Sequence, residues 1–140
     1  MKTLIKNGIV VNENKTCKLD ILIEGEYISK IEESITDKAD KIIDAKGLYV
    51  LPGIIDDQVH FREPGLTHKA DIYSESKAAV AGGITSFMEM PNTNPPATTL
   101  ELLENKFSIA KERSLANYSF FMGASNNNIK EVLKVNPKHV

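Results

Sequence analysis

The stretch GIIDDQVHFREPG, residues Gly53–Gly65, decides the fold of this chain. Side chains on a strand point alternately to two faces, so four polar residues are expected to share one face. These residues are Asp56, Gln58, His60 and Arg62. A buried strand would carry Val or Ile at such positions, so we expect this polar face at the mouth of a parallel barrel. The alternative is an exposed edge strand whose polar face is solvated.

The chain after this stretch alternates between strand and helix patterns. The expected elements are, in order, a helix capped by Asp71 and closed at Gly82-Gly83, a strand over 84–90, a helix with a capping box at Thr98 and Glu101, a strand over 118–122, and a helix capped by Asn128. Three βα units predict a parallel sheet with helices outside. A complete (β/α)8 barrel takes about 250 residues, so we expect the chain to be part of a longer polypeptide.

Residues 1–52 carry short strand patterns. The Asn7-Gly8 dipeptide between two apolar runs predicts a hairpin turn. Further strands are expected over 19–23, 27–31, 42–44 and 48–50. This meander predicts a small β-sandwich or a barrel-like module. The expected domains are therefore a β-rich module over 1–52 and the incomplete start of an α/β barrel over 53–140.

Composition excludes several classes of function. The chain has 140 residues, of which 41% are hydrophobic, and a net charge of −2, so it lacks the basic surface that nucleic acid or membrane lipid requires. Cys17 is the single cysteine, which excludes an internal disulfide framework and a cysteine zinc cluster. Polar residues interrupt the N-terminal apolar run too early for a signal peptide, and no run reaches the roughly 18 apolar residues of a membrane helix. We expect a cytoplasmic protein.

Two motifs resemble the cyclic-amidase branch of the amidohydrolase superfamily, which comprises dihydroorotases, allantoinases and dihydropyrimidinases. The stretch over 52–65 is similar to the first barrel strand of this branch. The motif MPNT at Met90–Thr93 resembles dihydroorotases in particular, since allantoinases more often carry Met-Pro-Leu there. The resemblance covers the whole chain, including the β module that the family places beside its barrel. It implies the first three βα units of a TIM-like (β/α)8 metal-dependent hydrolase barrel.

The resemblance also implies a reaction and a set of site residues. Dihydroorotases interconvert N-carbamoyl-L-aspartate and dihydroorotate in pyrimidine biosynthesis, with one or two divalent metal ions, usually zinc. His60 matches a metal ligand, and Arg62 and Asn92 match residues that bind the substrate carboxylate. The carboxylate that moves the proton and the remaining ligands are expected beyond residue 140. A homo-oligomer is implied, and aspartate transcarbamoylase is an implied partner.

The chain departs from the family pattern at Gln58, where the resemblance implies the first histidine of a metal-binding pair. A neutral amide oxygen is a poorer zinc ligand than imidazole, and Asp57 is expected on the opposite face unless the strand bulges. Three interpretations stay open. Gln58 or a water holds the metal weakly, a single metal is held by later residues, or the protein binds no metal and is inactive.

The site residues also have structural interpretations. Arg62 could form an ion pair with Glu63 or Glu89. Asn92 could be only a turn former, and His60 could be a core histidine. The functional alternatives are a non-catalytic dihydroorotase-like subunit that supports aspartate transcarbamoylase, an allantoinase and a dihydropyrimidinase.

Overall fold

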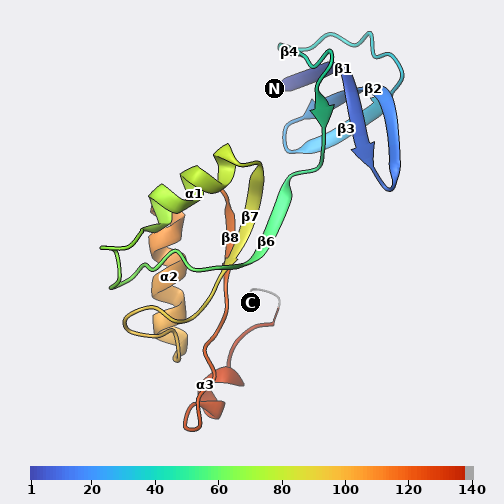
Figure 1. Ribbon diagram of the computed structural model, residues 1–140. Coiled ribbons are helices and arrows are strands. Elements are labelled where there is room, and N and C mark those ends of the chain that lie inside the picture. The colour runs from blue at the N-terminus through green and yellow to red at the C-terminus, as the bar shows by residue number, and fades with distance from the viewer. Residues whose placement is uncertain (138–140) are drawn as a thin grey trace. The chain divides into compact units, whose positions relative to one another are not determined.

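The computed structural model describes residues 1–137 and divides the chain into two compact units, Met1–Pro52 and Gly53–Val140. The predicted barrel portion 53–140 ends with Lys138–Val140, which lie outside the described residues. The elements in chain order are β1 (Lys2–Asn12), β2 (Lys15–Glu24), β3 (Tyr27–Glu32), β4 (Lys41–Asp44), β5 (Tyr49–Val50), β6 (Ile54–Val59), α1 (Ile72–Ala81), β7 (Ile84–Glu89), α2 (Leu100–Arg113), β8 (Asn117–Phe120) and α3 (Ile129–Val132) (Figure 1). Within residues 1–137, every helix is too short or too polar to cross a membrane.

The strands of residues 1–52 form one five-stranded sheet. β1 and β2 make an antiparallel hairpin, and the sheet order is β3-β2-β1-β4 with β5 also on β1. β4 and β5 both run parallel to β1, so the sheet is not the expected meander. Leu4, Leu22 and Ile35 form its buried cluster. Because the described strands of this unit all belong to this sheet, the predicted sandwich, which needs two facing sheets, is not confirmed.

The Asn7-Gly8 dipeptide lies inside β1, so the predicted hairpin turn is wrong at this position. Asn7 has a φ of 62° and the register of β1 against β2 shifts here, which marks a β-bulge. Asn7 N–H donates to Asp20 Oδ1 at 2.8 Å, and the Asn7 side-chain amide donates to Asp44 Oδ1 at 2.8 Å. These long-range bonds stabilise a left-handed residue within the strand. The turn between β1 and β2 falls instead at residues 13–14, which both have positive φ.

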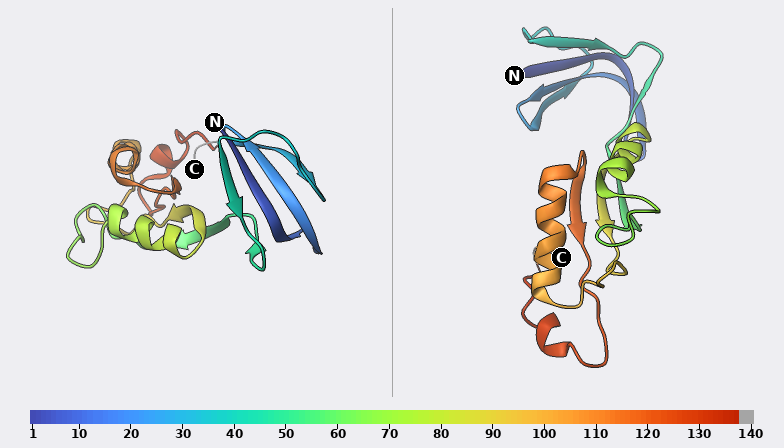
Figure 2. Two further views of the ribbon diagram at one scale, coloured as in Figure 1. Left: turned by 90° about the horizontal axis from the view of Figure 1, so that it is seen from above. Right: turned by 90° about the vertical axis from the view of Figure 1, so that its left-hand side faces the viewer.

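The second unit is a three-stranded parallel sheet with helices on one side. The strand order is β6-β7-β8, and α1 and α2 connect consecutive strands, which confirms the α/β character of this part. Figure 2 shows both helices on the same side of the strands, with α1 in contact with β7 and α2 in contact with β8. The core cluster between sheet and helices consists of Phe61, Ile72, Phe87, Leu103, Ala110 and Phe120. Among residues 53–137 this sheet has three strands and two unpaired edges, so the closed barrel stays a prediction.

The starts of the two longer helices follow local capping chemistry. Asp71 caps α1 as predicted, because its side chain accepts a hydrogen bond from Ser74 N–H at 2.8 Å. α2 is capped by Thr99, whose hydroxyl accepts from Leu102 N–H at 3.3 Å. The predicted capping box at Thr98 is therefore wrong by one residue.

Asn128 precedes α3 but makes no side-chain capping bond to it, so the predicted cap is wrong. Its Oδ1 accepts from Ser125 N–H at 2.7 Å. Its Nδ2 donates to the carbonyl oxygens of Thr98 and Gly123 at 2.8 and 2.7 Å. The side chain thus joins the loop after β8 to the loop after β7, at the carboxyl edge of the sheet.

Candidate active site

The carboxyl ends of β6 and β7 bring His60 and Asn92 together. Met90 N–H donates to Val59 O at 3.0 Å, and this bond joins the two segments at the point where the strands end. His60 Nδ1 lies 2.9 Å from Asn92 Oδ1. An amide oxygen can only accept, so His60 donates from Nδ1 in this contact, and in the neutral ring the lone pair then lies on Nε2. His60 is exposed and is not a core histidine, and its Nε2 has the chemistry of a metal ligand.

β6 is irregular where the resemblance implies a metal-binding pair. Its pairing with β7 shifts register twice, the second time between Asp56 and Val59, so the strand bulges at residues 57–58. Gln58 is exposed, and its N–H donates to Asp56 Oδ1 at 3.2 Å. Because the strand bulges and then ends at Val59, simple alternation of faces does not hold over Asp56–Arg62.

Arg62 follows the strand in a left-handed conformation with a φ of 71°. Such a conformation costs a non-glycine residue about 1–2 kcal/mol. Arg62 N–H donates to Glu89 Oε1 at 2.9 Å, and its carbonyl oxygen accepts from the backbone four residues later. The two candidate acidic partners are already paired, Glu63 with Arg113 and Glu89 with Lys106. Within residues 1–137 the Arg62 guanidinium therefore forms neither of the ion pairs in its structural interpretation.

The pair of Glu89 and Lys106 is buried next to the Arg62 backbone. Glu89 ends β7, and Lys106 reaches it from α2 with 2.9 Å between Oε2 and Nζ, each side chain being 1% exposed. Lys106 Nζ also donates to Met90 O at 3.0 Å and lies 4.9 Å from the centre of the Phe120 ring. Burial raises the pKa of Glu89 against the attraction of Lys106, and burial lowers the pKa of Lys106.

Sequence reasoning missed Lys106, although the helical pattern contains a signal for it. Lys106 lies three residues after Leu103 and four before Ala110, and both of these residues are buried. Residues at that spacing share one helix face. A lysine on a buried face needs a buried acceptor, and Glu89 at the end of the preceding strand is an acidic residue that can provide one.

A second network fixes the loop that carries Arg62. Glu63 is buried, and its Oε2 accepts from Ile72 N–H at the start of α1 at 2.9 Å. Its other carboxylate oxygen pairs with Arg113 at the end of α2. Arg113 also lies 3.2 Å from Asp71 Oδ2. Glu63, the residue after Arg62, thus contacts both α1 and α2.

Metal-ligating groups are few in this part of the chain. Among residues 1–137, no group of three or more His, Cys, Asp or Glu side chains is arranged to hold a metal ion. A catalytic zinc usually has three protein ligands. His60 offers one imidazole nitrogen, and Gln58 offers only an amide oxygen. Among residues 1–137 these two side chains could therefore supply only part of the ligand set of a metal ion.

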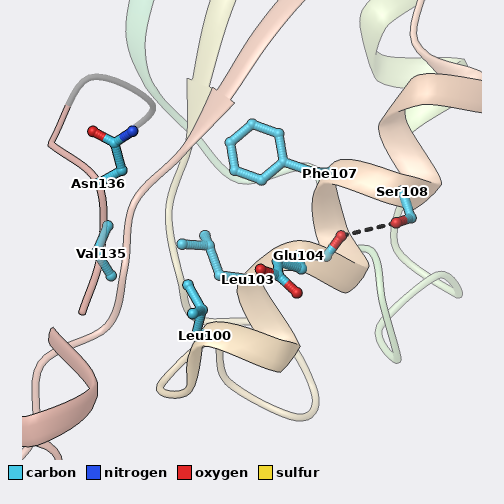
Figure 3. Close-up of a pocket in the computed structure, with 7 residues that line it drawn as sticks. All are labelled: Leu100, Leu103, Glu104, Phe107, Ser108, Val135 and Asn136. Atoms are coloured by element: carbon cyan, nitrogen blue, oxygen red, sulfur yellow. Dashed lines mark hydrogen bonds between the residues drawn. The ribbon is translucent and has the colours of Figure 1, made fainter.

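A separate groove of about 560 Å³ runs along α2 (Figure 3). It is lined mainly by apolar side chains of α2 and by Val135. Ser108 Oγ donates to Glu104 O at 3.0 Å, so this hydroxyl is engaged within the helix. None of the candidate site residues lines the groove, and it is not the candidate active site.

Known proteins share much of this sequence. A family model described as dihydro-orotase-like matches residues 47–130. The dihydroorotase of Aquifex aeolicus (strain VF5) is 51% identical over 98 residues, which cover 69% of this chain and 23% of that protein. The dihydroorotase of Streptococcus pyogenes serotype M3 is 46% identical over 113 residues, which cover 79% of this chain and 27% of that protein. The chain thus spans about a quarter of the length of the curated relatives it matches.

Solved structures with a similar fold include hydantoinases. The L-hydantoinase (dihydropyrimidinase) from Arthrobacter aurescens matches with a TM-score of 0.88 at 31% identity, over 93% of this chain and 29% of that one. A crystal structure of a D-hydantoinase matches with a TM-score of 0.81 at 31% identity, over 96% of this chain and 30% of that one. The family model covers more than half of the residues, and the chain belongs to the dihydro-orotase-like family.

Proposed function

We propose that this chain is the N-terminal part of a dihydroorotase, which interconverts N-carbamoyl-L-aspartate and dihydroorotate in pyrimidine biosynthesis in the cytoplasm. In the hydrolytic direction water adds across a ring amide: the carbonyl carbon gains a hydroxyl, the C–N bond breaks, and the nitrogen gains a proton. The observation that carries the proposal is the Arg62 guanidinium, which is free of both neighbouring carboxylates in a loop beside the His60–Asn92 contact. Family membership and the dihydroorotase relatives support it.

Arg62 and Asn92 are the proposed ligands of the substrate carboxylate. A guanidinium presents a planar fork that binds a carboxylate through two parallel hydrogen bonds. An amide side chain adds a neutral donor beside it. Glu63 and Glu89 are held by other cations, so they do not compete with the substrate for Arg62.

His60 is the proposed metal ligand in this part of the chain, through Nε2. Its Nδ1–H is held by Asn92, which fixes the ring orientation that a ligating histidine needs. Gln58 is a proposed weak or water-mediated ligand. Zinc, when bound, would supply Lewis-acid activation of the ring carbonyl. The acid–base group and the other ligands are proposed to lie beyond residue 140.

The same proposal covers the architecture and the partners. Residues 53–140 would be the first three βα units of a TIM-like (β/α)8 barrel, and 1–52 the β-rich module beside it. The open edges of β6 and β8 among the described residues are where further strands would pair. A homo-oligomer, with aspartate transcarbamoylase as a partner, is proposed on the family resemblance.

The test is made on the full polypeptide with metal analysis and an assay of dihydroorotate hydrolysis. We expect bound zinc and turnover. Arg62→Ala should raise KM for dihydroorotate roughly 100-fold, because two charge-assisted bonds are lost, and Arg62→Lys should recover part of the loss. Absence of both metal and turnover would instead support the non-catalytic subunit associated with aspartate transcarbamoylase.

A hydantoinase or dihydropyrimidinase is the second candidate, because the structural neighbours at 31% identity carry those names. A neutral ring has no carboxylate, so it gains nothing from Arg62. This candidate predicts turnover of hydantoin or dihydrouracil that Arg62→Ala leaves unchanged. An allantoinase would likewise act on a neutral ureide, and allantoin is the third substrate of the same assay.

A further inference from the structure

We infer that the buried Glu89–Lys106 pair is a positioning device for the two residues proposed to bind the substrate carboxylate, Arg62 and Asn92. The inference rests on the proposed function of that site. Glu89 and Lys106 are each about 1% exposed, so they act through the backbone of their neighbours and not on the substrate itself.

Glu89 controls the Arg62 side of the site. Its Oε1 accepts from Arg62 N–H at 2.9 Å. Burial raises the pKa of this carboxyl, and the Phe61 and Arg62 backbone both act to lower it. Arg62 has a φ of 71°, which an arginine adopts only when its surroundings compensate for the strain. The carboxylate provides that compensation at the point where the chain leaves β6. It therefore fixes the position of the Arg62 backbone, from which the side chain projects.

Lys106 controls the Asn92 side. Its ammonium lies 2.9 Å from Glu89 Oε2 and donates to Met90 O at 3.0 Å. Met90 is two residues before Asn92, in the loop that follows β7. One ion pair thus connects the loop after β6 to the loop after β7, and both loops carry a carboxylate-binding side chain.

Stability alone does not account for this pair. Removing two charges from water costs about as much as their attraction returns, and apolar pairs of similar volume often hold packed elements together as well as buried ion pairs do. Unlike an apolar pair, the ion pair provides an acceptor for the Arg62 amide and a donor for Met90 O. These functions concern the geometry of the two loops.

The experiment compares variants of the full polypeptide. Glu89→Gln replaces one of the two carboxylate oxygens by an NH2 group. The remaining oxygen can face either Lys106 or the Arg62 amide, so at the other contact two donors oppose each other. We expect KM for dihydroorotate to rise about ten-fold while kcat changes less than about three-fold, the pattern of lost ground-state binding. Hydrogen exchange at the Arg62 amide should accelerate in parallel.

Two further variants separate positioning from stability. Asp20→Asn is the matched control, because Asp20 is also a buried carboxylate that accepts two backbone amides and lies 3.8 Å from a lysine, but in the first unit. It should lower the melting temperature and leave KM unchanged. The double variant E89L/K106M replaces the pair by apolar side chains, so it should fold and still show the raised KM.

The outcomes are distinct. The inference is overturned if E89L/K106M has the KM of the wild type. It is also overturned if Glu89→Gln lowers the melting temperature but leaves KM at the wild-type value, because the role of the pair is then structural. A rise of KM in Asp20→Asn equal to that in Glu89→Gln also overturns it, since any loss of stability would then suffice. Absence of dihydroorotate turnover in the wild type overturns the proposed function before any variant is measured, and removes the substrate role inferred from it.

Discussion

Replacement of Gly65 by alanine should separate the two loops that carry Arg62 and Asn92. Gly65 has a φ of +82°, and a Cβ built on it lies 1.8 Å from Asn94 O. Real Cβ atoms essentially never approach a neighbour closer than 3.0 Å. The loops must therefore part by about 1.2 Å, the difference between these two distances. The obstacle is a backbone carbonyl, which cannot rotate aside as a flexible side chain can.

Two effects set the loss in the free energy of unfolding. The left-handed conformation costs alanine about 1 kcal/mol after the entropy it saves in the unfolded chain. Parting the loops also breaks the hydrogen bond from Asn94 N–H to Pro64 O, now 3.1 Å, and removes the contacts around it, which adds about 1–2 kcal/mol. We expect about 2–3 kcal/mol for Gly65→Ala.

Gly83→Ala is the matched control for this prediction. Gly83 has a φ of +88°, but a Cβ there would meet nothing within 4 Å, so only the conformational cost of about 1 kcal/mol applies. The assay is the urea midpoint of the full polypeptide, together with KM for dihydroorotate. Gly65→Ala should lower the midpoint more and raise KM, whereas Gly83→Ala should leave KM unchanged. Equal midpoints and equal KM in the two variants would refute the reasoning.

Three further predictions concern other parts of the chain. Gln58→His should raise the metal content of the full polypeptide, measured by elemental analysis, since imidazole is the better zinc ligand; unchanged content would remove Gln58 from the proposed site. Thr99→Ala should cost about 1 kcal/mol in urea denaturation and Thr98→Ala much less, because only Thr99 caps α2. Burial pushes the pKa of Asp20 upward, but two backbone amides and Lys6 outweigh it and hold the pKa below the ordinary 3.8. The charged Asp20 therefore contributes its full stabilisation of the fold at pH values above 3.8, and this contribution is lost as the pH falls through the lowered pKa of the folded state. Between about pH 5 and pH 3 the urea midpoint should thus fall less in Asp20→Asn than in the wild type.

The elements that sequence predicted well are those whose signals are local. Asp71 caps α1 through Ser74, three residues away, a contact between sequence neighbours that these residue types favour. The Asn7-Gly8 dipeptide is a turn signal of the same local kind, yet it forms a bulge. The reason is non-local: Asp20 and Asp44 accept the Asn7 donors, and these acceptors are distant in the sequence.

The candidate site also has a part that the sequence predicts and a part that depends on non-local contacts. Proximity of His60 and Asn92 follows from topology, because neighbouring parallel strands end at one edge of a sheet, and the 2.9 Å contact agrees with it. The left-handed backbone of Arg62 could not be predicted by alternation along a strand, because the bulge in β6 and the Glu89 carboxylate both intervene. The Glu89 carboxylate is itself held by Lys106 of α2, a contact that periodicity alone does not determine.

The contact between His60 and Asn92 explains why an amide is suited to position 92 in the proposed enzyme. Asn92 Oδ1 accepts from His60 Nδ1, which leaves its two N–H donors for the substrate carboxylate. An aspartate there would accept from the histidine but repel the carboxylate, and an apolar residue would do neither. Only a side chain with an acceptor and donors can orient the metal ligand and bind the substrate at once. In the proposed site the metal ligand and the carboxylate ligand would therefore share one hydrogen bond, so a change at Asn92 should affect metal content and KM together.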